Sequence, residues 1–166
     1  MAEATLVNIV ATYSAEAQMI GLWQYAAGVP AGLQTPAPIE IVLPRISNDT
    51  ASYRNSQNST NLSGKTYVFN LEAISVASKS ENFDIRFFNK YDNNPANLIK
   101  TINEFLVYTA VPLSVVDSTF DIFIVRNRDN PPTNKIYFHV VNYAGIATGP
   151  IDIEIIYQCY QDRQFR

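Results

Sequence analysis

Apolar and polar residues alternate with a period of two along most of this chain. The clearest case is segment 151–158, IDIEIIYQ, in which Ile151, Ile153, Ile155 and Tyr157 share one face. Such alternation is typical of a strand with one face in a core and the other in solvent. Similar runs predict further strands at 6–13, 39–43, 65–78, 83–87, 98–109, 120–124 and 136–140. The pattern therefore predicts an all-β protein of about eight strands.

Two of these segments depart from simple alternation. Within 65–78, the aromatic and apolar side chains of 67–71 share one face, whereas Ile74 and Val76 fall out of phase with them. This change of phase predicts a β-bulge or corner near Ala73. Segment 98–109 is apolar and also fits a short helix, but we interpret it as a strand.

Turn-forming residues separate the predicted strands. Segments 92–95 (DNNP), 127–132 (NRDNPP) and 143–150 (YAGIATGP) combine Asn and Asp, which bond their own backbone, with Pro and Gly. Short strands at regular spacing favour a sandwich or a barrel. We expect residues 1–166 to form one domain, an antiparallel β-sandwich of about eight strands and of jelly-roll type. A chain of this length buries enough surface to fold without disulfides.

Segment 14–38 breaks the strand pattern. It is rich in Ala, Gly and Pro, and it is longer than most connections between strands. The segment either folds back to plug one end of the sandwich or forms an arm that docks on a neighbouring subunit. For the second alternative, the predicted interface residues are Met19, Leu22, Trp23 and Tyr25.

Segment 47–64 is almost wholly polar, which predicts a long exposed loop. Three Asn-x-Ser/Thr patterns begin at Asn48, Asn58 and Asn61. The beginning of the chain lacks the basic and apolar regions of a secretory signal, so we interpret these patterns as evidence of exposure only.

Charge argues against two classes of partner. The net charge is −3, with 12 Lys and Arg scattered among 15 Asp and Glu. Nucleic-acid binding and attachment to anionic membranes both depend on clustered basic residues, so neither is expected. No apolar run is long enough to insert in a membrane. Charged residues make up only 16% of the chain, against about 25% in an average domain, which suits surfaces that meet other protein.

No residue pattern predicts catalysis, a cofactor or a metal. His139 and Cys159 are the only residues of their kinds, and neither lies in a recognisable nucleophile motif. We interpret His139 as a satisfied histidine on a sheet face. A lone cysteine excludes an intrachain disulfide and a Cys-rich zinc site.

Acidic side chains also have a simpler interpretation than catalysis. Four of them alternate with apolar residues and are predicted to face solvent from the sheets: Asp84, Asp121, Asp152 and Glu154. The turns at 92–94 and 127–130 contain oxygen ligands that calcium accepts, but they lack the spacing of a calcium loop.

The run 145–157 (GIATGPIDIEIIY), the Asn-rich turns, the low charge and a beginning directly at a strand resemble virus and phage structural proteins. These are the single jelly-roll or β-sandwich capsid, penton and decoration proteins. The resemblance implies a non-enzymatic component of a virion, assembled in the host cytoplasm, that associates with copies of itself or with other shell proteins. The N-terminus is not basic, which favours an outer, minor or vertex component. The alternative is a β-sandwich module that binds a glycan or a receptor.

Overall fold

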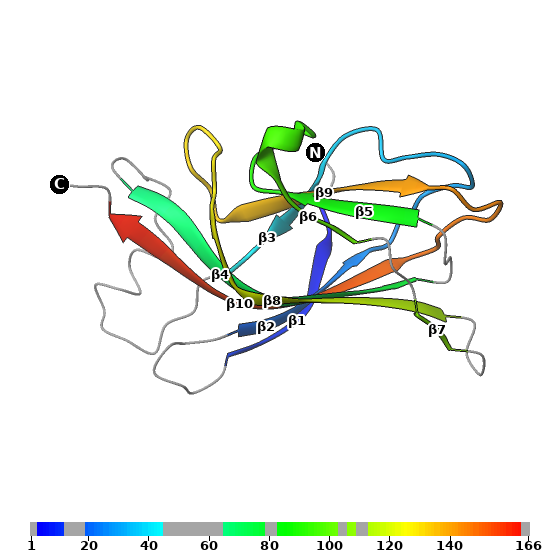
Figure 1. The fold of residues 1–166 in the computed structure, drawn as a ribbon, viewed down its shortest axis with the longest axis horizontal. Helices are drawn as coiled ribbons and strands as arrows, with labels where there is room; N and C mark the ends of the chain where they lie inside the picture. The colour runs from blue at the N-terminus through cyan, green and yellow to red at the C-terminus, as the bar shows by residue number, and fades with distance from the viewer. Residues whose placement is uncertain are drawn as a thin grey trace.

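A computed structural model describes residues 3–11, 19–44, 65–78, 83–102, 106–108 and 113–163. Within them the chain forms ten strands and one short 3-10 turn (Figure 1). The elements are β1 (Thr5–Ala11), β2 (Met19–Tyr25), β3 (Ile39–Val42), β4 (Lys65–Ser78), β5 (Phe83–Phe88), η1 (Pro95–Asn97), β6 (Leu98–Ile102), β7 (Leu106–Tyr108), β8 (Leu113–Arg126), β9 (Lys135–Asn142) and β10 (Ile151–Arg163). No helix of the described residues is long and apolar enough to cross a membrane.

The strands form two stacked sheets, as Figure 1 shows. One contains six strands in the order β1-β2-β10-β4-β8-β7, and the other contains four in the order β3-β9-β5-β6. Four antiparallel pairs are nested along the chain, from the outermost pair to the innermost. They are β2 with β10, β3 with β9, β4 with β8 and β5 with β6. A long hairpin wound around itself gives this nested pairing, which is the jelly roll. The predicted antiparallel β-sandwich is therefore confirmed.

Both irregular segments form strands. The β4–β8 register shifts between Leu71 and Ala73, and the buried positions change phase from Phe69 and Leu71 to Ile74 and Val76. The predicted bulge near Ala73 is confirmed. Segment 98–109 forms β6 and β7 rather than a helix, with 103–105 and 109 outside the described residues.

In the described part of segment 14–38, the structure contains a strand, which neither of the two alternatives, the plug and the arm, had predicted. Met19–Tyr25 is strand β2, hydrogen-bonded between β1 and β10, and residues 26–38 connect it to β3. The alternation is hidden in the sequence because Gly21 occupies an inward position, where the Trp23 ring covers it. A Cβ atom on Gly21 would lie 2.3 Å from Trp23 Cη2. Residues 14–18 and the predicted loop 47–64, including its three Asn-x-Ser/Thr patterns, lie outside the described residues.

Large side chains of both sheets fill the space between them. The Trp23 ring centroid lies 6.1 Å from that of Tyr157, and Tyr25 packs edge-on against Phe138 at 5.8 Å. The hydroxyl of the buried Tyr157 donates a hydrogen bond of 2.8 Å to the carbonyl of Pro44, so its one polar atom is satisfied.

Candidate functional site

Two connections meet at one end of the sandwich. The β2–β3 connection (26–38) and the β9–β10 connection (143–150) approach each other on the right-hand side of Figure 1. Backbone hydrogen bonds join them: Gly32 N donates to Ala144 O at 3.1 Å, and Thr148 N donates to Val29 O at 2.9 Å. We call residues 26–38 and 143–150 together the loop end.

One buried side chain, that of Asn142, holds both connections. Its amide group Nδ2 lies 3.2 Å from the carbonyl oxygen of Val29, 3.2 Å from that of Pro30 and 2.8 Å from that of Ile146. Its Oδ1 accepts a hydrogen bond of 3.0 Å from Ala144 N. A single residue at the end of β9 therefore fixes the relative position of the two loops.

Close backbone contact also locks the loop end. Gly28 has a φ of +61°, and a Cβ atom there would lie 2.2 Å from the carbonyl oxygen of Gly149. Only glycine fits this conformation and this distance. The Thr148 hydroxyl accepts a hydrogen bond of 2.9 Å from Val29 N on the opposite loop. The loop end is therefore a preorganised surface.

The preorganised surface is apolar and carries no charge of its own. Neither 26–38 nor 143–150 contains an Asp, Glu, Lys, Arg or His residue. Three large side chains are mostly exposed there: Leu33 at 57%, Tyr143 at 54% and Ile146 at 60%. An apolar surface of this kind, fixed in place, is typical of a docking site.

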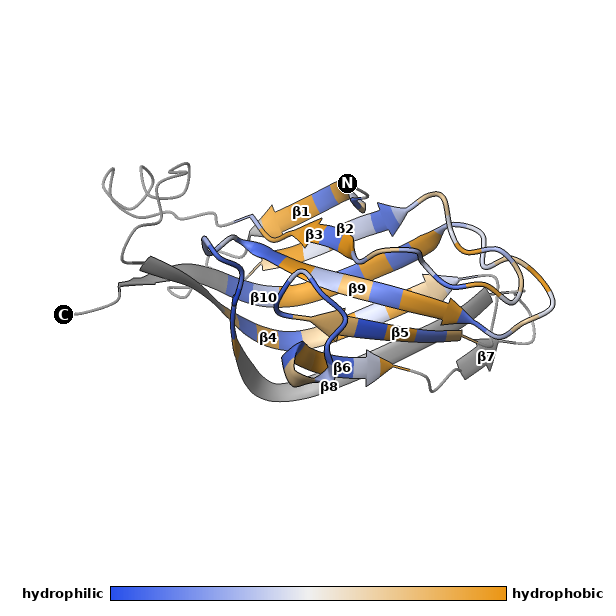
Figure 2. Cartoon of the chain, turned by 90° about the horizontal axis from the view of Figure 1, so that it is seen from above, coloured by the Kyte–Doolittle hydropathy of each residue, from blue (hydrophilic) through white to orange (hydrophobic). Residues whose placement is uncertain are grey.

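The opposite end of the sandwich has a different character. Its connections 89–97 and 127–134 contain Lys90, Asp92, Arg128 and Asp129. In Figure 2 these connections are blue, whereas those of the loop end are paler or orange. Among the described connections, those of the loop end are therefore uncharged and those of the opposite end are charged.

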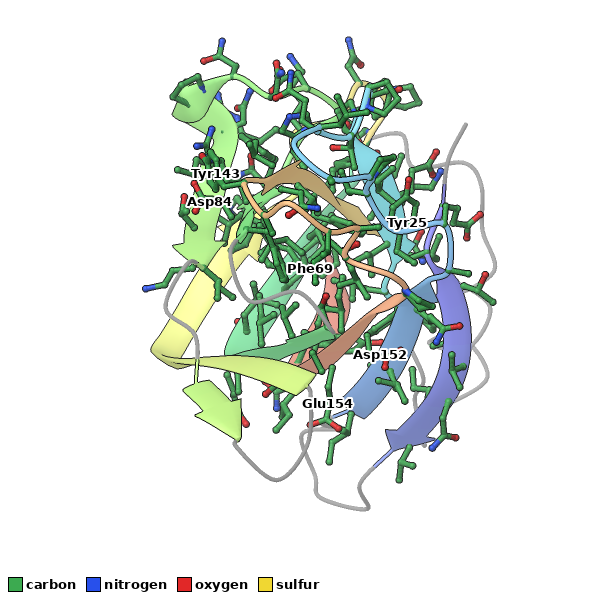
Figure 3. All side chains as sticks on the ribbon, turned by 90° about the vertical axis from the view of Figure 1, so that its right-hand side faces the viewer. Tyr25, Phe69, Asp84, Tyr143, Asp152 and Glu154 are labelled. Carbon is green, nitrogen blue, oxygen red and sulfur yellow. The ribbon has the colours of Figure 1, made fainter. Side chains whose placement is uncertain are left out.

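A neutralised polar cluster borders the loop end. Tyr143 donates a hydrogen bond of 3.1 Å to Asp84 Oδ2, and Arg86 Nη2 lies 3.3 Å from the same oxygen. Figure 3 shows Tyr143 and Asp84 side by side. The hydrogen bond to Asp84 raises the pKa of Tyr143. The carboxylate of Asp84 is thereby balanced by the guanidinium group of Arg86.

The four predicted interface residues lie on strand β2 and not in the loop end. Met19 and Trp23 are fully buried between the sheets, so they have no surface to offer a partner and that expectation is corrected. Tyr25 is half-buried and packs against the core, and Leu22 is half-buried on the opposite face of β2. The sequence reasoning missed Leu33, Tyr143 and Ile146, although the absence of charge from both connections was a signal that could have found them.

The acidic residues singled out from the sequence lie on the outer faces of the sheets. Asp84 alternates with core residues of β5. Asp152 and Glu154 point away from the core on the outer face of the six-stranded sheet (Figure 3). Asp152 accepts a hydrogen bond of 3.0 Å from Gln24 Nε2. The side chains of Asp121 and Cys159 lie outside the described part of the chain.

His139 ties the loop end to strand β9. Its Nδ1 atom lies 2.7 Å from Thr35 Oγ1, and the same hydroxyl accepts a hydrogen bond of 3.1 Å from Val140 N. Because that oxygen is an acceptor for Val140, its own proton is available to a neutral imidazole. Burial lowers the pKa of His139, and the positive charge of Arg86, directly opposite on β5, lowers it further. His139 therefore acts as a structural link in its neutral form.

We predict that acidification destabilises the fold through His139. The pKa of this residue lies below its ordinary value of 6.5 in the folded chain, so the unfolded chain binds the proton more readily. The contribution of neutral His139 is complete above that ordinary value, and it is lost as pH falls from there towards the folded pKa. Thermal unfolding compared at about pH 7.5 and about pH 5 should show a smaller drop in Tm for His139→Asn, which keeps an acceptor but does not titrate. Equal drops in both proteins would contradict this role.

The candidate calcium ligands serve to close loops. The Asp129 carboxylate accepts hydrogen bonds from the Tyr137 hydroxyl, from Thr133 Oγ1 at 2.7 Å and from Tyr91 N at 2.9 Å. Asp92 Oδ1 accepts from Asn97 Nδ2 at 3.1 Å. Burial, together with the hydrogen bond to Asp129, raises the pKa of Tyr137. Among the described residues, no three His, Cys, Asp or Glu side chains gather as metal ligands.

Comparisons with solved structures give only distant similarity. A lipoprotein from Bacteroides thetaiotaomicron aligns with 98% of this chain and 89% of its own, at 10% identity and a TM-score of 0.37. The unassembled VP1 pentamer of KI polyomavirus aligns with 87% of this chain and 75% of its own, at 7% identity and a TM-score of 0.14. No protein-family model and no curated protein matches the sequence. The assignment of the jelly-roll β-sandwich rests on the strand order of the two sheets.

Proposed function

We propose that this chain is a non-enzymatic structural subunit of a virus or phage particle, which associates with copies of itself or with other shell proteins. The observation that carries the proposal is the loop end, a locked and uncharged surface with three exposed apolar side chains. Because its loops are already fixed by Asn142 and Gly28, little conformational entropy is lost when a partner binds.

The lack of charge favours contact between identical copies. Around a rotation axis, equivalent surfaces of identical subunits converge, and near the axis each residue approaches copies of itself. A charged residue close to the axis would therefore meet the same charge, whereas Leu33 and Ile146 would meet further apolar surface. The two connections of the loop end satisfy this condition along their whole length. The jelly roll supports the particle role, although lectins and cupins use the same fold.

Charging the loop end should disperse the assembly. In the double variant Leu33→Lys and Ile146→Lys, each copy brings two ammonium groups to the shared surface. We expect the contacts made through the loop end to be lost, so that the protein sediments as a smaller species than the unmodified chain, measured by sedimentation velocity over a range of concentrations. Both side chains are mostly exposed, so the fold should survive.

The matched control adds the same charge at the opposite end. Asn93→Lys with Ala96→Lys changes two exposed residues of the β5–β6 connection. This protein should sediment like the unmodified chain. If the loop-end variant also sedimented like the unmodified chain while remaining folded, the loop end would not be the association surface.

One observation favours the glycan- or receptor-binding alternative. Tyr143 presents an exposed aromatic ring beside a carboxylate and a guanidinium group. Rings with one apolar face and a polar neighbour suit ligands that are themselves part apolar and part polar. Saturable glycan binding by a monomeric chain, abolished by Tyr143→Ala, would favour this candidate over the first.

A further inference from the structure

The four edge strands of the two sheets are protected to different degrees. An open edge invites pairing with another chain, and proteins blunt it with short strands, charges or cover. In the described part of the chain, β7 has only three residues and β6 carries Lys100. Strand β3 has four residues, and its edge is covered where Ala4 N donates a hydrogen bond of 2.9 Å to Glu40 O. Each of these three edges therefore has a recognisable protection.

Strand β1 contains no charged residue, and no described strand covers its outer edge. Its sequence, TLVNIVA, contains neither a charged residue nor a proline over seven positions. Leu6, Val7 and Val10 are 39%, 57% and 50% exposed. The strand pairs with β2 on one side, and no described strand pairs with its other side. Its one irregularity is a register shift between Leu6 and Asn8, after which Asn8–Ala11 pairs regularly with β2.

We propose that the outer edge of β1 is a β-augmentation site for the β1 strand of a second copy. The two strands would pair antiparallel across a twofold axis and join the two six-stranded sheets into one continuous sheet. The inference is independent of the proposed function, because it concerns a sheet edge rather than the loop end.

The chemistry of β1 fits a second copy. In a twofold antiparallel pair, the residue on the axis faces its own copy, so a charge at or next to the axis would lie close to the same charge of the second copy. Strand β1 has none. Its one amide side chain, Asn8, can donate and accept at once, so it can pair with its own copy.

The neighbouring surface continues the apolar character of the edge. On the outer face of the sheet, Val10 lies opposite Ile20, and Ile20 lies opposite Ile156. Ile20 and Ile156 are half-buried. This row runs inwards from β1 across β2 to β10. Pairing of two copies would place two such rows on one joined face and bury apolar surface next to the new hydrogen bonds.

The test places a charge on the edge. Val10→Lys should raise the dissociation constant of the twofold dimer on the order of 100-fold, because each copy would bring an ammonium group against the apolar edge of the other. Val7→Lys, at the most exposed position of the strand, provides a second variant. The control is Leu98→Lys on edge strand β6, which replaces another exposed aliphatic side chain and should leave the dimer unchanged. Sedimentation equilibrium measures all four proteins, and circular dichroism establishes that each is folded.

Combining Val10→Lys with the loop-end variant distinguishes association through the β1 edge from association through the loop end. The Leu33→Lys and Ile146→Lys protein should still form the twofold dimer, and adding Val10→Lys should reduce it to monomers. Backbone amides of β1 should be protected from hydrogen exchange in the dimer and lose that protection in Val10→Lys. If folded Val10→Lys and Val7→Lys associate like the unmodified chain, or if β1 amides exchange equally fast in both states, the β1 site is overturned whatever the loop end does.

Discussion

Replacing Trp23 with alanine should cost about 3–5 kcal/mol of the free energy of unfolding, the range found for large aromatic residues removed from a packed core. The indole is fully buried and packs against Tyr157 and over Gly21. Its removal would leave a cavity between the sheets that the strand backbone cannot close. Urea unfolding followed by circular dichroism measures the loss.

The neighbouring residue provides a control from the same strand. Leu22 lies on the opposite face of β2 and is half-buried, so Leu22→Ala should cost about 1 kcal/mol or less. Equal effects at the two positions would mean that β2 does not bury alternate side chains. This comparison tests directly whether this segment is a strand of the six-stranded sheet rather than an arm.

A double-mutant cycle should show that Gly21 and Trp23 depend on each other. In the unmodified chain, the Cβ atom of Gly21→Ala would lie 2.3 Å from Trp23 Cη2, so the ring must shift. In the Trp23→Ala background the same methyl group would enter the cavity. We therefore expect Gly21→Ala to destabilise the first protein and to be neutral or stabilising in the second. Additive effects would contradict the observed contact.

Gly28→Ala should be the most costly glycine substitution at the loop end, at about 2–4 kcal/mol. The left-handed backbone conformation accounts for about 1–2 kcal/mol of this loss, and forcing the two connections apart accounts for the rest. The methyl group would lie 2.2 Å from the Gly149 carbonyl oxygen, a backbone atom that cannot rotate away. The free energy of unfolding, again from urea titration, is the quantity to compare.

Two other glycines separate backbone strain from contact. Gly32 has a φ of +71° and open space around its Cα, so Gly32→Ala should show the conformational cost alone. Gly145 has open space and no positive φ, so Gly145→Ala should lie within about 0.5 kcal/mol of the unmodified chain. A Gly28→Ala protein no less stable than Gly32→Ala would show that the two connections are not locked together.

Local patterns predicted most of the strands because each strand has one face in the core. Alternation in 151–158 identified β10, and the change of phase at Ile74 identified the bulge in β4. The alternation did not predict strand β2, because Gly21 occupies an inward position without an apolar side chain, and the Trp23 ring fills that space. A glycine two positions before a tryptophan was the available signal.

The loop end was harder to predict than the strands. Its position depends on contacts between distant parts of the chain, such as Asn142 with Val29 and His139 with Thr35. Periodicity within a segment does not reveal such contacts. Large aromatic residues drew the interface prediction to Trp23, but the winding of the jelly roll buries that residue and exposes Leu33 and Ile146 instead.

The molar mass of the unmodified chain in solution tests the central claim most directly. Light scattering behind size-exclusion chromatography, at several protein concentrations, measures it without any substitution. Self-association through the loop end predicts a discrete closed assembly of two or more copies, whose population rises with concentration. A monomer of 18.6 kDa at every concentration would contradict self-association as the role of this protein.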